Sequence, residues 1–184
     1  MRVLLTGATG LIGGAVLRRL TPEHEVLALT RRAETHASLA DAGAAPILGA
    51  LADVGRWAAD LPPLDALVHC AADFSAPDMG AAEAPFIEAI EAGRLPLKPG
   101  ARILYTGGVW LYPAGAETVS DEATPLDPLP AFAWMARHWR RLESVAGVKA
   151  ICIHPGLVFD ESGRGAIAPL IEALGTGGPL PLCG

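Results

Sequence analysis

Short apolar runs alternate with segments of helical periodicity along the whole chain. Each apolar run has the length of a buried strand, and these runs are residues 3–6, 26–29, 45–48, 65–72, 102–106 and 148–154. The segments between them repeat apolar side chains every three or four positions, as helices do, and they are residues 10–20, 33–42, 54–59, 79–92, 132–146 and 166–174. Strands that alternate with helices predict an α/β fold with a doubly wound parallel sheet in three layers, α/β/α.

Three glycines at a spacing of three follow the first predicted strand and open the first predicted helix. Gly7 permits a tight turn, Gly10 leaves room for a pyrophosphate at the helix start, and Gly13 lets the helix pack closely on the strand. The spacing differs from that of the commonest dinucleotide fingerprint, and a structural turn without a ligand is the alternative. The strand before the loop and the helix after it favour a phosphate site.

The sequence T-G-A-T-G-L-I-G at residues 6–13 resembles the nucleotide loop of the extended short-chain dehydrogenase/reductases, the NAD-dependent epimerase/dehydratase family. Residues 65–72 resemble the family's D-x-V-x-H-x-A-A motif, and residues 154–160 resemble its R-P-x-x-V-Y-G segment. The resemblance implies a Rossmann fold whose cofactor crosses the switch point of the sheet. It also implies cofactor contacts from Gly7, Thr9, Gly10, Leu11, Ile12, Gly13, Leu51, Ala71, Ala72, Thr106, Pro155 and Val158.

The residues after the second predicted strand favour NADP as the cofactor, with NAD possible. NAD-binding members place an acidic residue there, whereas this chain has Arg31 and Arg32, whose guanidinium groups can pair with a 2′-phosphate. The alternative is that both arginines only cap the strand at the surface. The family's G-D-L segment is replaced by residues 49–51, so only the backbone contact of Leu51 can be carried over, and we expect Asp53 to cap the helix at residues 54–59.

The catalytic groups of the family are missing from this chain. Members use a Ser or Thr to bind the reacting group, and a Tyr with a Lys four residues later as the acid/base and its activator. The alignment puts Gly108, Met135 and Trp139 at these positions. Tyr112 and His138 are weak substitutes, and we expect His138, which lies among arginines, to face solvent.

Two further expectations concern packing. His69 lies within a predicted strand, where a hydrogen-bonded core histidine is more common than a catalytic one. The predicted helix at residues 132–146 has an apolar stripe that either covers the sheet or meets a second subunit, and we favour a homodimer. The stripe consists of Phe132, Met135, Trp139, Leu142 and Ala146.

Composition narrows the class of protein. A chain of 184 residues predicts one NAD(P)-binding domain over residues 1–184, without the substrate portion into which family members continue. The net charge of −6 argues against a nucleic-acid partner. The sequence contains neither a membrane-spanning run nor a secretory signal, so we expect a cytoplasmic protein. Cys70, Cys152 and Cys183 are expected to be reduced thiols, and no metal site is expected because the cysteines lack histidines at ligand spacing.

Two functions remain open from the sequence. The first is an oxidoreductase or isomerase that acts on a small carbonyl or sugar-like metabolite with unusual catalytic residues. The second is a non-catalytic sensor or regulatory protein that binds the dinucleotide and has no substrate. Fold analogy does not separate them, because the residues of the site determine the chemistry.

Overall fold

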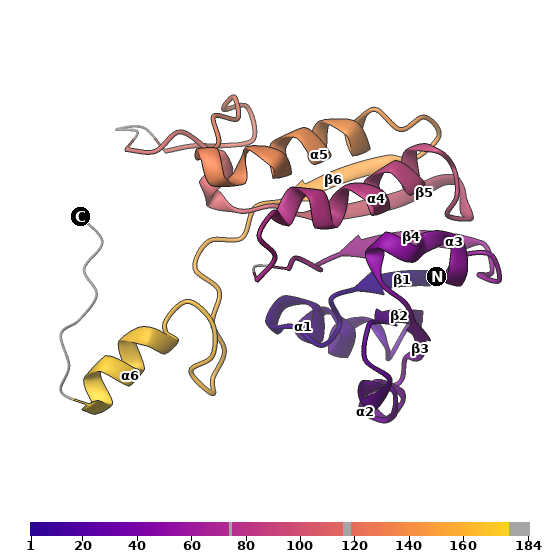
Figure 1. The fold of residues 1–184 in the computed structure, drawn as a ribbon, viewed down its shortest axis with the longest axis horizontal. Helices are drawn as coiled ribbons and strands as arrows, with labels where there is room; N and C mark the ends of the chain where they lie inside the picture. The colour runs from indigo at the N-terminus through magenta and orange to yellow at the C-terminus, as the bar shows by residue number, and fades with distance from the viewer. Residues whose placement is uncertain (74, 116–118, 177–184) are drawn as a thin grey trace.

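The computed structural model describes residues 1–73, 75–115 and 119–176, and it contains the predicted parallel sheet (Figure 1). Its strand order is β3-β2-β1-β4-β5-β6, and every adjacent pair of strands is parallel. The order reverses between β1 and β4, which places the switch point at the carboxyl ends of these two strands. The strands are β1 (Arg2–Thr6), β2 (Glu25–Thr30), β3 (Ala45–Leu48), β4 (Leu64–His69), β5 (Leu97–Thr106) and β6 (Lys149–Ile153).

Helices cover the sheet on both faces, and two apolar clusters fill the space between the layers. Alternation along β1 divides its side chains: Leu4 faces the cluster under α3, α4 and α5, whereas Val3 and Leu5 face the cluster under α1 and α2. The helices are α1 (Leu11–Leu20), α2 (His36–Asp41), α3 (Val54–Trp57), α4 (Met79–Glu91), α5 (Ala133–Glu143) and α6 (Ala168–Thr176). The 3₁₀ turns are η1 (Ala33–Thr35), η2 (Leu51–Asp53), η3 (Val109–Leu111) and η4 (Pro130–Phe132).

The structure corrects several predicted boundaries. The predicted helix at residues 33–42 is divided into η1 and α2, and α5 is shorter than predicted at both ends. The expected cap from Asp53 is wrong: its side chain makes no capping hydrogen bond. The residue also closes η2, so its backbone follows the preceding turn and does not present the carboxylate to α3.

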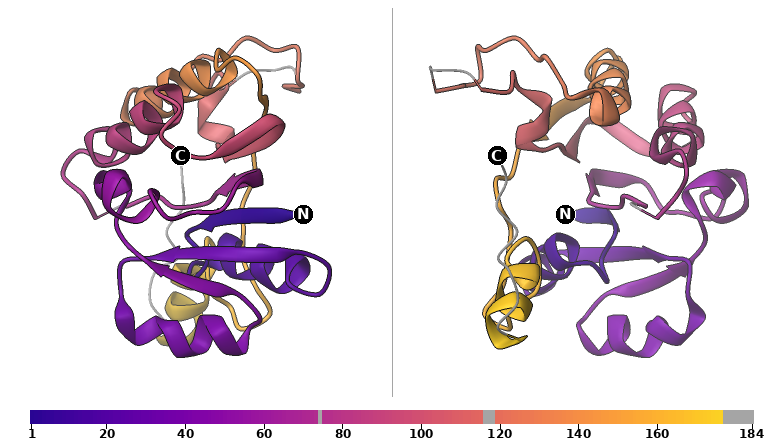
Figure 2. Two further views of the ribbon diagram at one scale, coloured as in Figure 1. Left: turned by 90° about the vertical axis from the view of Figure 1, so that its right-hand side faces the viewer. Right: turned by 60° about the vertical axis from the view of Figure 1, so that its left-hand side comes forward.

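One part of the sheet is not covered on the side of α1. The side chains of Ile151 and Ile153 in β6 are 46% and 51% exposed. The helix α6 has no buried residue and projects away from the layers (Figures 1 and 2). The third layer is therefore incomplete beside β5 and β6 in the part of the chain that the structure describes.

The apolar stripe of α5 packs within the chain. Met135 and Leu142 are buried in the cluster under α4 and α5, Trp139 packs against that cluster, and Ala146 is exposed beyond the helix. The stripe therefore supports the interpretation that it covers the sheet of its own chain, and the homodimer stays a prediction. No helix within the described ranges has the length and apolar character that a membrane span requires.

Candidate cofactor and substrate site

The glycine loop has the shape of a phosphate cradle. Gly7 has a φ of 74°, and an added β-carbon would lie 2.6 Å from the Cys70 carbonyl carbon. A β-carbon on Gly13 would collide with the Gly7 carbonyl oxygen and lie 2.6 Å from the carbonyl carbon. Gly10 is the N-cap of α1 and contributes no side-chain cap. The first N–H groups of a helix have no intrahelical partner, so this backbone fits a phosphate without further distortion.

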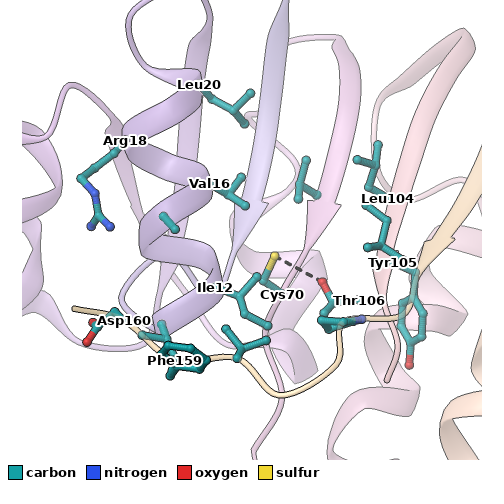
Figure 3. A pocket seen from close by; sticks show the side chains of 16 residues that line it. Ile12, Val16, Arg18, Leu20, Cys70, Leu104, Tyr105, Thr106, Phe159 and Asp160 are labelled. Carbon is teal, nitrogen blue, oxygen red and sulfur yellow. Dashed lines mark hydrogen bonds between the residues drawn. The ribbon is translucent and has the colours of Figure 1, made fainter. Parts of the chain in front are cut away.

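Two cavities open at the carboxyl edge of the sheet beside this loop. The first has a volume of about 410 Å³ and lies between α1 and the ends of β4 and β5 (Figure 3). The second has a volume of about 310 Å³. Ile12, Cys70, Thr106, Pro155 and Val158 line both cavities. The structure thus brings together predicted residues from three separate segments: the start of α1, the end of β5 and the segment after β6.

The second cavity contains most of the predicted nicotinamide-side residues and some that were not predicted. Ala71 and Ala72 line it together with the shared residues of β5 and the segment after β6. Leu11 lines only the first cavity, whereas Thr9 is exposed at the loop. The sequence analysis did not place several residues of this lining in the site, among them Glu83, Trp110 and Leu157. It named Met135 only as the position where the family has its catalytic tyrosine.

The two thiols that the structure describes are free, in agreement with the expectation of reduced cysteines. The Thr106 hydroxyl lies 3.4 Å from the Cys70 sulfur (Figure 3). Burial raises the pKa of Cys70, and burial raises the pKa of Cys152 to about 12. Both groups therefore stay protonated at neutral pH and act as small apolar side chains. The third cysteine, Cys183, lies outside the described residues.

The adenosine end of the expected site contains one ion pair that the sequence did not predict. Arg31 Nη1 lies 2.8 Å from Asp73 Oδ2, and both Arg31 and Arg32 are exposed. Hydrogen bonds from Ser75 and from Arg31 lower the pKa of Asp73 to about 2. The backbone N–H of Gly49, the residue after β3, donates a hydrogen bond to the Thr30 carbonyl oxygen. The end of β3 and the following Leu51 therefore lie at the same edge of the sheet as the end of β2.

The three positions of the missing catalytic groups are filled by other side chains. A β-carbon on Gly108 would collide with the indole of Trp110, with Cδ2 at 2.8 Å, so the ring takes the space of a serine side chain. Met135 is buried in the wall of the second cavity, and Trp139 stacks on Tyr105. Tyr112 packs edge-on against an imidazole and lies outside both cavity linings as described.

A buried carboxylate beside the second cavity holds two imidazoles and a phenol. Glu83 Oε1 lies 2.8 Å from His69 Nε2, and Glu83 Oε2 lies 2.5 Å from His138 Nδ1. The Tyr105 hydroxyl donates to Oε2 at 3.0 Å. The exposed fractions of Glu83, His69 and His138 are 4%, 2% and 6%. His69 is therefore a hydrogen-bonded core histidine, as expected.

The prediction that His138 faces solvent is wrong. The side chain of His138 lies on the buried face of α5 with Met135 and Leu142, while Arg137 and Arg140 face outward. The reason is that Glu83 on the neighbouring helix offers a buried acceptor, which offsets the cost of removing the imidazole from water. The signal in the sequence was helical spacing: residues 135, 138 and 142 share one face.

The electrostatics of this cluster are set by opposing effects on Glu83. Burial raises the pKa of Glu83, and hydrogen bonds from His138 and His69 lower it by more, to about 2. Burial and the neighbouring carboxylate raise the pKa of Tyr105 above its usual range, so the phenol remains a donor. Glu83 is accordingly ionised at neutral pH.

The Thr6 hydroxyl fixes the orientation of the His69 ring. It lies 2.6 Å from His69 Nδ1 and also accepts the backbone N–H of Ala71 at 3.3 Å. All these groups are satisfied when the hydroxyl donates to Nδ1 and the ring donates Nε2–H to Glu83, which is the assignment we adopt. A continuous set of hydrogen bonds thus connects the end of β1 and the segment after β4 with the buried carboxylate.

The strand order, the glycine cradle and the cavities at the switch point are those of the Rossmann fold, the class of fold that binds dinucleotides at this edge of the sheet. Comparison with known families is consistent with this class and is more specific. The model of the NAD-dependent epimerase/dehydratase family matches residues 3–184. The chain belongs to that family.

Solved structures share the fold of this chain. A double mutant of dTDP-glucose 4,6-dehydratase from Streptomyces venezuelae, with NAD bound, matches all of this chain and 65% of its own chain at 23% identity and a TM-score of 0.77. UDP-glucuronic acid 4-epimerase from Bacillus cereus, also with NAD, matches all of this chain and 66% of its own at 16% identity and a TM-score of 0.73. At these identities the likeness shows the fold alone.

Two other relatives are matched over very different shares of their own length. A protein assigned to the short-chain oxidoreductases from Thermus thermophilus is matched over 98% of its chain, at 25% identity and a TM-score of 0.62. An uncharacterised protein of Schizosaccharomyces pombe is 38% identical over 72 residues, which are 39% of this chain and 24% of that protein. The matched segment therefore spans about a quarter of this curated relative.

Proposed function

We propose that the chain binds NADP and acts as an oxidoreductase or isomerase on a small carbonyl or alcohol. The observation that supports this most is the meeting of the glycine cradle and the second cavity at one edge of the sheet. Family membership adds to it, because members use the nicotinamide of NAD or NADP in their chemistry.

The chain's own residues suit the binding of such a cofactor. The N–H groups at the start of α1 would hold the pyrophosphate, and the guanidinium of Arg31 would pair with a 2′-phosphate. Ala71, Pro155 and Val158 would lie against the nicotinamide end and exclude water from it. The bound cofactor would supply the hydride donor or acceptor, which protein side chains lack.

A non-catalytic dinucleotide sensor is the second candidate. It is favoured by the side chains at the family's catalytic positions, where Trp110 takes the space of the serine, and Met135 and Trp139 replace the phenol and the ammonium. A sensor would bind NADPH and turn over no substrate. The two candidates therefore agree on binding and differ on catalysis.

Cofactor choice is tested by calorimetry with NADPH and NADH on the parent chain and on Arg31→Ala. We expect tighter binding of NADPH by the parent. Arg31→Ala should weaken NADPH binding roughly tenfold to a hundredfold, since a charge-assisted hydrogen bond contributes ~1.5–3 kcal/mol, and should leave NADH binding unchanged. Equal affinities of the parent for the two cofactors would contradict the proposal.

A further inference from the structure

We propose that Glu83 is the acid/base group of this site, in place of the phenol and ammonium that the chain lacks. In alcohol oxidation its carboxylate would accept the substrate's hydroxyl proton. This inference rests on the proposed function, since it assumes that the second cavity receives a substrate beside a nicotinamide.

Position is the first argument for this role. Glu83 comes from α4 and lines the second cavity together with Ala71 and Thr106. Of the described residues in this lining, Glu83 alone is charged, because Cys70 remains a neutral thiol.

The hydrogen bonds around Glu83 leave room for one more donor. A carboxylate offers about four lone-pair positions. Oε2 accepts from His138 and Tyr105, whereas Oε1 accepts from His69 only. One acceptor position therefore remains on Oε1, which is what a substrate hydroxyl requires. The three donors hold the carboxylate in one orientation, so His69, His138 and Tyr105 are positioning residues.

The groups that face Glu83 also keep it in its basic form. His69 faces it from β4, Tyr105 from β5 and His138 from α5. Hydrogen bonds from the two imidazoles lower the pKa of Glu83 against the opposing effect of burial. The carboxylate of Glu83 is therefore ionised at neutral pH, which is the form that accepts a proton.

The step balances with the nicotinamide as oxidant. The O–H bond of a secondary alcohol would break as its proton forms an O–H bond on Glu83 Oε1, and the electron pair of the carbinol C–H bond would leave as hydride to the oxidised nicotinamide that a bound cofactor supplies. The products are a ketone, a reduced nicotinamide and a protonated Glu83.

The rest of the cavity wall indicates the class of substrate. Trp110, Met135 and Leu157 give it a largely apolar surface, and no lysine, arginine or histidine is among its described lining residues. A phosphate or carboxylate on the substrate would lie near Glu83 without a cation to offset the repulsion. The cavity therefore favours a small, uncharged, mostly apolar alcohol or ketone.

The test measures oxidation of small secondary alcohols, 2-butanol, 2-octanol and cyclohexanol, by the full chain with NADP⁺, followed by NADPH absorbance. Glu83→Gln should lower kcat by at least roughly a hundredfold, the size of general acid/base help, with unchanged NADPH binding. Glu88→Gln, which changes an exposed glutamate on the same helix, is the matched control and should change neither. Turnover that survives in Glu83→Gln would overturn the assignment of Glu83 as the base and would leave the proposed enzymatic function in place.

A second measurement covers the case in which Glu83→Gln does not fold. His138→Leu removes one of the bonds that lower the pKa of Glu83, so the acidic limb of the kcat/KM profile should move to higher pH. An unmoved limb in this variant would reject the base. If the parent binds NADPH and turns over neither alcohols nor ketones, both the enzymatic function and the base are rejected.

Discussion

Alanine substitutions at two adjacent glycines of α1, Gly13 and Gly14, test whether the close packing of this helix on the glycine loop is needed for stability and cofactor binding. A methyl group at Gly13 would collide with the Gly7 carbonyl group, whose carbon would be 2.6 Å away. Because both contact partners are backbone, relief requires the helix to move away from the loop. Gly14 is the control: its nearest atom would be the Ala8 carbonyl oxygen at 3.4 Å, an ordinary contact distance.

The two variants should therefore change stability in opposite directions. Gly13→Ala should lower the free energy of unfolding by ~1–3 kcal/mol, the range for overpacking. Gly14→Ala should raise it by ~0.5–1 kcal/mol, because alanine is the better helix former. Urea unfolding measures both, and calorimetry should show weaker NADPH binding for Gly13→Ala only. Equal stability and equal NADPH affinity of Gly13→Ala and the parent would refute the cradle geometry.

Two further predictions concern the charged groups. Asp73→Asn removes the partner of Arg31, so NADPH affinity measured by calorimetry should rise by up to about fivefold, the size of effect expected from loss of an exposed ion pair. The same substitution should not change NADPH affinity when Arg31 is already alanine, and weaker binding by Asp73→Asn would contradict the prediction. The second prediction concerns pH: the pKa of Glu83 is lowered from 4.5 to about 2 in the folded chain, so its stabilising contribution is present above about pH 4.5 and is lost as the pH falls toward 2. In urea unfolding at pH 5, 4 and 3, Glu83→Gln should show a smaller loss of stability than the parent, and parallel losses would argue against the ionised cluster.

The parts of the structure that the sequence predicts are those governed by local sterics and periodicity. The turn at Gly7 and the close packing at Gly13 follow from the absence of a β-carbon, which the sequence states directly. Apolar runs likewise identify the strands of the sheet, whose parallel order follows from the intervening helices. The parallel pairing of β1 with both β2 and β4 confirms the doubly wound sheet.

The parts that the sequence misses depend on contacts between distant residues. The partner of Arg31 lies 42 positions away in a loop, and no periodicity indicates it. The alignment also shows that Gly108 has no hydroxyl, but it does not show that Trp110 takes the vacant space. The bare face of β6 could not be predicted either, since an alternating strand looks the same whether or not a helix covers it.

The buried cluster of Glu83 and His138 lies between these two cases. Helical spacing in the sequence places both residues on apolar helix faces, but their polar character makes them look like surface residues. Glu83 shares a helix face with Met79, Phe86 and Ile90, and His138 shares one with Met135 and Leu142. A search for apolar stripes treats each polar residue as an interruption at the surface. Burial of either group alone would cost several kcal/mol, so both become tolerable only as a pair across α4 and α5. A glutamate on the apolar face of one helix therefore predicts a buried partner, and a histidine on the apolar face of the neighbouring helix is a candidate for it. Only the sequence and the order of the layers are needed for this inference.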